Sequence, residues 1–285
     1  MNNYYEDKTH LTNSMINDFV NIVKWWKKYY TPDVFYNLHI KQVGRLESTD
    51  VMELWKIVDE HFSEWVDVLT KYKVVDLRTK AGKEEMEANP DICVSQDIYN
   101  KIELLINALY SDDRYMRFLK DKNTISQVIL QKEYEYADIN WEIKTIKIKG
   151  KPDHINRTSK ILVDLKTTAN YEMLVEDMQW NLVPKIDYNY FRQLALYNWL
   201  DWWDNKCYLC IADYKNTYIS KDNKKLWRVK WIFVPDYILK KSLESIFEDI
   251  RELAKYKDDK WEWDTEKFTQ DLDIFTEVLS DNQEI

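Results

Sequence analysis

The stretch KGKPDHINRTSKILVDLKTTAN, Lys149 to Asn170, places charged residues where a buried strand is expected. Its aliphatic run ILVDL contains Asp164 and is followed directly by Lys166. An ionised carboxylate or ammonium inside an apolar strand is costly unless it is paired or holds a metal. The segment therefore predicts either a structural ion pair or a functional site.

The spacing of these charges favours a site. Asp164 and Lys166 are two residues apart on a strand, so they project to the same face, and Asp153 closes the turn after the preceding strand. If the two strands pair as a hairpin, Asp153 and Asp164 approach each other at its open end. A divalent cation such as Mg²⁺, which takes oxygen ligands, would relieve their repulsion. Beside bound metal, Lys166 could orient or help deprotonate the attacking water, or stabilise charge on a phosphoryl group, which points to metal-assisted phosphodiester hydrolysis.

Composition limits what this site can belong to. The chain has 285 residues, 45% of them hydrophobic, enough for one large core. The net charge of −9 does not favour a polyanionic partner, so nucleic acid would have to meet local basic patches. The candidate patches, for which a solvated face is the simpler interpretation, are Lys144, Lys147, Lys149 and Lys151, and Lys221, Lys224, Lys225, Arg228 and Lys230. We find no membrane span or secretory signal in the sequence and expect a cytoplasmic protein.

Three cysteines do not predict a disulfide framework. Cys207 and Cys210 form a CxxC motif within KCYLCIADY, a pattern typical of a buried strand. Residues three apart on a strand face opposite ways, so we interpret them as structural cysteines and not as zinc ligands.

Hydrophobic periodicity orders the chain as helices, three strands, helices, two strands and a helix. This order predicts an α/β fold with a central mixed β-sheet flanked by helices, in which an N-terminal helical region (1–124) packs on a core (125–285). The expected helices are 11–30, 50–69, 95–110, 171–181, 187–203 and 235–257, and the expected strands are 126–137, 140–150, 160–168, 207–214 and 226–234.

The full spacing, Pro152-Asp153, ten residues, then Asp164-Leu165-Lys166, resembles the signature of the PD-(D/E)XK nuclease superfamily. Downstream, Gln193 and Tyr197 are four apart on an expected helix and resemble the Gln-x-x-x-Tyr motif of the RecB-like branch. Within that branch the chain is similar to the phage exonuclease VIII (RecE-type) recombination exonucleases, from about Ile125 to Lys257.

This resemblance implies a restriction-endonuclease-like core and specific roles for the matching residues. Asp153, Asp164 and the Leu165 carbonyl would be metal ligands, with Mg²⁺ as the cofactor and Mn²⁺ as a substitute. Lys166 would be the catalytic lysine beside the two aspartates. Gln193 and Tyr197 would shape the site near the DNA backbone.

One position departs from the family pattern. The family carries a further metal-ligating His in a Gly-x-x-x-His context, but here Trp55 replaces the Gly and Asp59 occupies the His position. Asp59 could serve as an oxygen ligand, and His61 is an alternative. Glu133 and Glu135 could also contribute a carboxylate, although we expect them on the exposed face of an edge strand. Whether one metal or two are bound depends on Asp59.

The function that the resemblance implies is a Mg²⁺-dependent DNA exonuclease that degrades duplex ends in a bacterial host and leaves single strands for an annealing protein. Such enzymes often act as ring-shaped homo-oligomers. Three alternatives remain open: an endonuclease of the same superfamily, a catalytically degenerate module for DNA binding or assembly, and a structural protein in which Asp164 and Lys166 merely pair with each other.

Overall fold

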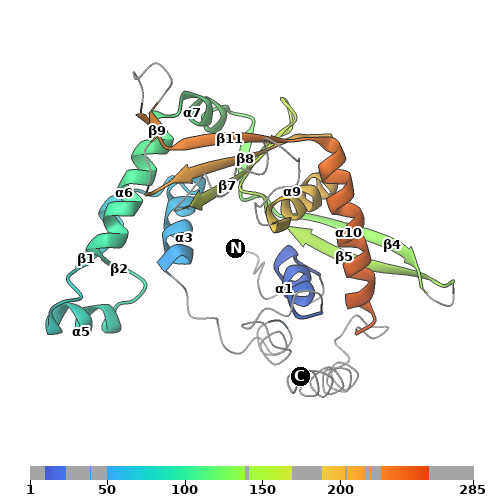
Figure 1. Cartoon of the computed structure of the whole chain (residues 1–285), viewed down its shortest axis with the longest axis horizontal. Helices are drawn as coiled ribbons and strands as arrows, with labels where there is room; N and C mark the ends of the chain where they lie inside the picture. The colour runs from blue at the N-terminus through green and yellow to red at the C-terminus, as the bar shows by residue number, and fades with distance from the viewer. Residues whose placement is uncertain are drawn as a thin grey trace, which may run out of the picture.

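A five-stranded mixed β-sheet forms the centre of the protein, seen here in a computed structural model (Figure 1). The structure describes residues 10–23, 39, 50–138, 141–168, 188–202, 204–215, 218–219 and 226–256. The strand order is β11-β8-β7-β6-β3, and only the β7–β8 pair within this sheet is parallel. The five strands are β3 (Thr124–Ser126), β6 (His154–Asn156), β7 (Ile161–Thr168), β8 (Lys206–Asp213) and β11 (Val229–Val234). The expected α/β fold with a central mixed sheet is confirmed.

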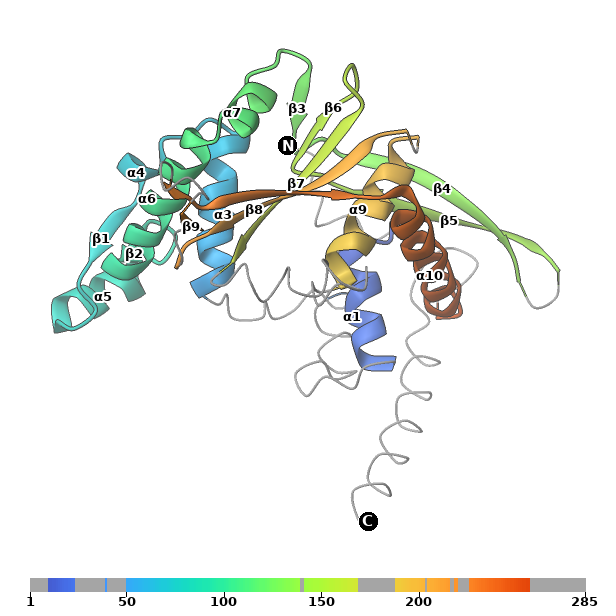
Figure 2. The same cartoon turned by 45° about the horizontal axis from the view of Figure 1, so that its top comes forward.

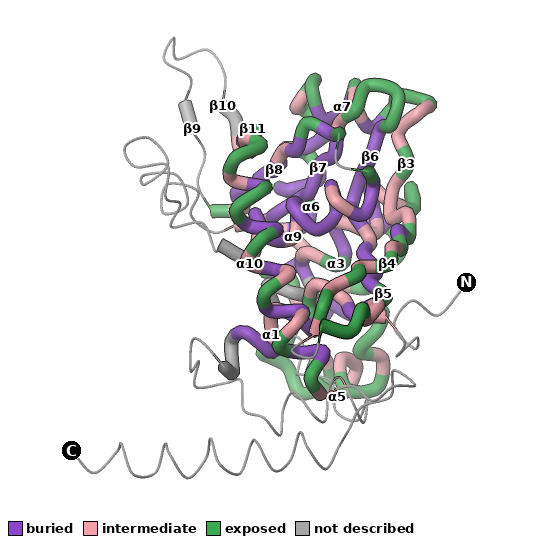
Figure 3. The backbone as a smooth tube through the Cα atoms, turned by 90° about the vertical axis from the view of Figure 1, so that its right-hand side faces the viewer, coloured by how far each residue is buried: buried purple, intermediate pink, exposed green. Residues whose placement is uncertain are grey.

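Helices cover both faces of the sheet (Figure 2). One face packs against α9 (Tyr188–Leu200) and α10 (Asp236–Ala254), and α1 (Asn13–Val23) packs on these two helices in the same core. The other packs against α3 (Asp50–Ser63), α6 (Gln96–Ser111) and α7 (Asp113–Leu119). The central strands are buried between these two layers (Figure 3).

The two cysteines of the CxxC motif lie on opposite faces of strand β8, each in a different apolar core. Cys207 belongs to the α9/α10 core and Cys210 to the α3/α6 core, and both are buried free thiols. Their predicted placement on opposite faces of a buried strand is confirmed. Burial raises the pKa of the Cys210 thiol well above its usual range, because a thiolate there would lose its hydration.

Strands β3 and β4 (Leu130–Ala137) form one long hairpin with β5 (Ile143–Gly150) and β6, broken at its middle. Ser126 pairs with His154 before the break and Leu130 pairs with Gly150 after it, so three residues on each side interrupt the ladder without changing its register. The Gln127 N–H still donates to the Asp153 carbonyl across the break, at 2.9 Å. The interruption turns β4 and β5 away from the sheet (Figure 2) and leaves Asp153 at the bend.

The described chain before residue 124 is mostly helical, as the sequence predicts. Helix α6 begins where expected, with the Ser95 hydroxyl accepting a hydrogen bond from the Ile98 N–H as an N-cap. The sequence did not predict the short elements α4 (Val68–Lys71), β1 (Lys73–Val75), α5 (Lys80–Ala88), β2 (Cys93–Ser95) and β9 (Tyr218–Ile219), and the one strand expected over 226–234 is divided into β10 (Leu226–Trp227) and β11. Most of these span four residues or fewer, too short for a periodic pattern to emerge.

Several expected features fall outside the described residues. These are the helical stretches at 24–30 and 171–181, the lysines Lys221, Lys224 and Lys225, and the chain beyond residue 256. Among the described helices, none combines the length and apolarity that a membrane crossing requires.

The lysines of the first candidate basic patch, Lys144, Lys147, Lys149 and Lys151, do not form a single exposed face. Lys147 is exposed, but Lys149 is only 1% exposed, which corrects the interpretation of these lysines as a shared solvated surface. A segment distant in sequence pairs with this strand: the Lys149 N–H donates to the Leu11 carbonyl and the Leu11 N–H donates to the Lys147 carbonyl. The N-terminal segment thus covers this edge of β5.

A buried ion pair joins α9 to α10. The Arg192 guanidinium lies 2.6 Å from Asp249 Oδ2 and donates to the Ser245 hydroxyl at 2.9 Å. Both charged side chains are almost completely buried. Losing one partner would leave the other as an uncompensated buried charge.

We therefore expect Asp249→Ala to lower the free energy of unfolding by about 3–5 kcal/mol. Glu252→Ala is a matched control on the same helix, because Glu252 pairs with Lys255 at the exposed surface and such pairs contribute about 0–1 kcal/mol. Urea denaturation of the three proteins measures both values. An equal loss of unfolding free energy in Asp249→Ala and Glu252→Ala would contradict a special contribution of the buried Arg192–Asp249 pair.

Candidate active site

Asp153, Asp164 and Lys166 come together at the bend in the hairpin. Strand β6 pairs antiparallel with β7 so that His154 lies opposite Val163, which places Asp153 opposite Asp164. Asp153 Oδ2 accepts a hydrogen bond from the Leu165 N–H at 2.7 Å, and Lys166 Nζ lies 2.6 Å from Asp164 Oδ2. All three charged side chains are buried. The approach of the two aspartates expected from the sequence is therefore present.

The charges of this cluster do not balance, because two carboxylates share one ammonium. Burial raises the pKa of Asp153 well above its usual range, and repulsion from Asp164 adds to this. Burial also raises the pKa of Asp164, although Lys166 opposes that shift. Burial alone would lower the pKa of Lys166, but the carboxylates of Asp164 and Asp153 outweigh it and raise the pKa. Without metal, Lys166 is therefore an ammonium and cannot act as a base.

The oxygens of Asp164 fit a cation. Both are buried and make no hydrogen bond of good geometry with the described residues; their close partners there are the Lys166 ammonium, 2.6 Å from Oδ2, and the side chain of Asp153. Buried carboxylate oxygens without well-formed hydrogen bonds are costly, and a hard divalent ion satisfies them. Within the described ranges, however, no three His, Cys, Asp or Glu side chains are grouped as metal ligands. The available donor set is Asp153, Asp164 and the Leu165 carbonyl.

Two aromatic side chains complete the walls around Lys166. Trp55 Nε1, from α3, donates to the Leu165 carbonyl at 3.1 Å, and a carbonyl oxygen keeps a second lone pair for another partner. Lys166 Nζ lies 5.8 Å from the centre of the Trp55 ring and 5.2 Å from that of Tyr190 on α9. These cation–π contacts fix the ammonium between the two helical layers. The sequence identified Trp55 only as a departure from the family pattern and did not identify Tyr190.

Asp59 lies beside the cluster, but a neutral side chain separates it from Asp153. Gln127 Nε2 is 3.0 Å from both carboxylate oxygens of Asp59 and 3.2 Å from Asp153 Oδ1. The Ser63 hydroxyl donates to Asp59 Oδ1 at 2.8 Å. Burial raises the pKa of Asp59, while these hydrogen bonds partly oppose the shift. No sequence pattern pointed to Gln127, because it lies between β3 and β4.

The other proposed contributors of a carboxylate or imidazole lie elsewhere. His61 Nε2 is 2.9 Å from the Tyr110 hydroxyl, and its ring packs edge-on against Phe62. Glu133 and Glu135 are on the exposed face of β4, as expected. Of these alternatives, only Asp59 is close to the paired aspartates.

Gln193 and Tyr197 lie on one face of α9 and contact each other. Gln193 Nε2 donates to the Tyr197 hydroxyl at 2.8 Å. Tyr197 packs against Gly150, three residues before Asp153: a Cβ added at Gly150 would lie 2.7 Å from Tyr197 Cδ1 and 2.8 Å from Leu200 Cδ1. The missing side chain at Gly150 is what lets α9 approach the end of β5.

We expect Gly150→Ala to destabilise the protein by about 1–3 kcal/mol, because the new methyl group forces the Tyr197 ring and the backbone apart. Lys147→Ala on the exposed face of the same strand is the control, with an expected effect within about 0.5 kcal/mol. Chemical denaturation measures both. A Gly150→Ala protein as stable as the wild type would contradict this close packing.

His154 follows Asp153 but faces the opposite side of the sheet, where it contacts α7. Its Nε2 is 2.9 Å from the Tyr115 hydroxyl and its Nδ1 is 2.9 Å from the Ser126 hydroxyl. Burial lowers the pKa of His154 from 6.5 to about 4, because a charged imidazolium would lose its hydration. The folded protein therefore holds a neutral histidine at neutral pH.

This depressed pKa makes stability depend on pH. Below pH 6.5 the unfolded chain binds a proton at His154, but the folded protein does not bind it until the pH is about 4. The free energy of unfolding therefore falls as the pH is lowered from 6.5 to about 4. The loss amounts to about 3 kcal/mol at 1.36 kcal/mol per pKa unit. We expect the stability difference between wild type and His154→Gln to shrink by that amount across this window, measured by urea denaturation in EDTA. A difference that does not vary with pH would refute this role of His154.

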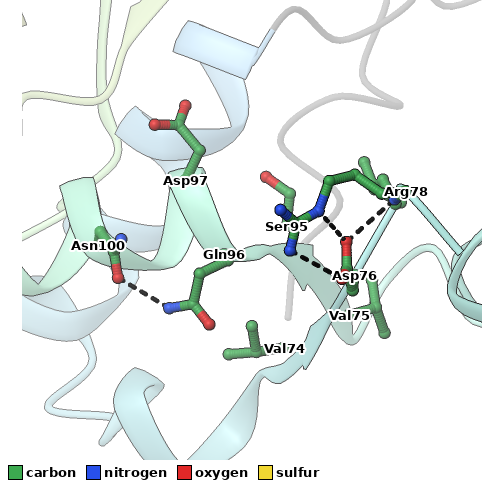
Figure 4. Close-up of a pocket in the computed structure, with 9 residues that line it drawn as sticks. Val74, Val75, Asp76, Arg78, Ser95, Gln96, Asp97 and Asn100 are labelled. Carbon is green, nitrogen blue, oxygen red and sulfur yellow. Dashed lines mark hydrogen bonds and ion pairs between the residues drawn. The ribbon is translucent and has the colours of Figure 1, made fainter.

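A pocket of about 640 Å³ lies away from this cluster, at the ends of β1 and β2 and the start of α6 (Figure 4). Its polar groups are largely engaged with one another: Asp76 binds Arg78, and Gln96 donates to Asn100. None of the residues that line it belongs to the Asp153–Lys166 cluster. The arrangement gives no specific indication of a ligand.

Comparison with known proteins adds little to this geometry. No family model and no curated protein matches the chain. A solved structure described as "Crystal structure of SSO0001" is similar at 20% identity, covering 68% of this chain and 83% of its own, with a TM-score of 0.26. So low a TM-score supports no conclusion about fold or function.

Proposed function

We propose that the protein is a Mg²⁺-dependent DNA nuclease of the PD-(D/E)XK type. The observation that carries the proposal is Asp164, a fully buried carboxylate that lies against a second buried carboxylate, Asp153, with one ammonium, Lys166, to compensate both. A protein that only needed a core would place an apolar residue there, because a buried ion pair is rarely more stable than well-packed apolar side chains.

Each residue of the cluster has a distinct role in this proposal. Asp153, Asp164 and the Leu165 carbonyl hold the ion, which supplies Lewis-acid catalysis when bound. The Lys166 ammonium, held between Trp55 and Tyr190, stabilises negative charge on the phosphoryl group. Gln193 and Tyr197 border the site and position the DNA backbone.

We propose digestion from duplex ends as the mode of action, on the resemblance of the Asp-Leu-Lys and Gln-x-x-x-Tyr motifs to the recombination exonucleases. A single-strand annealing protein would then take the product strands, and a homo-oligomer could enclose the duplex. The setting would be the cytoplasm of a bacterial host.

One observation favours a second candidate, a degenerate DNA-binding module. Gln127 lies between Asp59 and Asp153, so the described residues bring no third ligand side chain to the two aspartates. A module of this kind would keep the fold and bind DNA without cutting it.

End-labelled linear duplex DNA and closed circular DNA, incubated in Mg²⁺ or EDTA, test the proposal. We expect the wild type to degrade only the linear DNA and only in Mg²⁺. Lys166→Ala should lower the rate by about 10²–10³-fold, because it removes one charge-stabilising donor. Lys83→Ala on the distant helix α5 is the matched control and should keep the wild-type rate.

The other outcomes discriminate between the candidates. Cutting of the circle would assign an endonuclease of the same chemistry. Wild-type protein that binds both DNA forms and degrades neither would support the degenerate module. Digestion at the wild-type rate in EDTA, or by the Lys166→Ala variant in Mg²⁺, would refute the assigned site.

A further inference from the structure

Gln127 occupies an unusual backbone position beside the proposed metal site. It lies in the interruption between β3 and β4, and its φ of 53° is in the left-handed region. Few residues other than glycine adopt this conformation, and it persists only where surrounding contacts impose it. One contact that imposes this conformation is the hydrogen bond from the Gln127 N–H to the Asp153 carbonyl, at 2.9 Å.

The side chain of Gln127 ends between two carboxylates. Its Nε2 lies 3.0 Å from each oxygen of Asp59 and 3.2 Å from Asp153 Oδ1. The NH₂ end of the amide thus faces both carboxyl groups, whose oxygens accept its hydrogen bonds. The amide thereby satisfies, without a charge of its own, oxygens that would otherwise repel each other.

This placement has a consequence for metal binding. A second ion in a two-metal site lies about 3.5–4 Å from the first and needs further oxygen ligands beyond those that hold the first. Asp59 is the nearest additional carboxylate, but both its oxygens already contact the Gln127 amide. An amide nitrogen is a donor and cannot ligate a cation. Asp164, in contrast, has no contact with the Gln127 amide; its close partners among the described residues are Lys166 and Asp153.

We infer that Gln127 is a positioning residue that holds Asp59 outside the metal coordination and limits the site to one divalent ion. The inference rests on the proposed function. According to this inference, Asp59 holds the Gln127 side chain in place and is not the metal ligand predicted from the sequence. Gln127→Glu would replace the neutral donor with a carboxylate between Asp59 and Asp153 and so create a second cation site.

Counting bound Mn²⁺ by electron paramagnetic resonance of the free ion tests this directly and does not depend on activity. We expect one ion per chain for the wild type and two for Gln127→Glu. Gln131→Glu, the same substitution on the exposed face of β4, is the matched control and should bind one. Adding Asp59→Asn to Gln127→Glu should return the count to one.

Thermal unfolding in EDTA shows whether Gln127→Glu folds. If it does not fold, Asp59→Asn in the otherwise native protein provides a second test of the inference. If Asp59 is not a ligand, this variant should still bind one ion, with an affinity lowered by no more than about 10–100-fold, the usual cost of losing a residue that only supports a metal ligand. A larger loss of affinity would overturn the inference.

The remaining outcomes separate this inference from the proposed function. A wild type that binds two ions and digests DNA overturns the role of Gln127 and leaves the nuclease in place. A folded Gln127→Glu that binds one ion also overturns it. A wild type that binds no ion and is inert on DNA refutes both proposals together.

Discussion

The buried carboxylate of Asp164 is the constraint around which this part of the protein is arranged. Strand pairing brings Asp153 against it, and the two-residue period of β7 brings Lys166 to the same face. Because two carboxylates outnumber one ammonium, the neighbouring elements supply neutral donors and aromatic faces in place of more charge. Trp55, Tyr190 and Gln127 are these partners, and they come from α3, α9 and the break in the long hairpin.

Such a cluster costs stability, and other regions of the fold offset that cost. The raised pKa values of Asp59, Asp153 and Asp164 mean that each resists ionisation in the folded protein, so at neutral pH their charges oppose folding. The compensating contribution comes from two apolar cores, one on each face of the sheet. The sheet holds the charges rigidly because its central strands are buried on both sides, and that rigidity is what a preorganised site requires.

The bend in the hairpin connects the fold to the site. An uninterrupted ladder from β3 to β4 would hold residues 151–153 in regular pairing. The interruption keeps the register but frees Asp153 to turn toward β7 and Gln127 to reach Asp59. A local break in secondary structure thus places two polar side chains that a regular strand would have pointed elsewhere.

The sequence by itself determined the α/β class, most of the longer elements and the shared face of Asp164 and Lys166, because periodicity of two and of 3.6 residues is a local property. It also placed Cys207 and Cys210 on opposite faces of one strand. Only the tertiary structure decided that Trp55 binds the Leu165 carbonyl, 110 residues away, that Gln127 separates Asp59 from Asp153, and that Lys149 is buried. These contacts join segments distant in the chain, and they depend on how helices and strands pack, which no local pattern encodes.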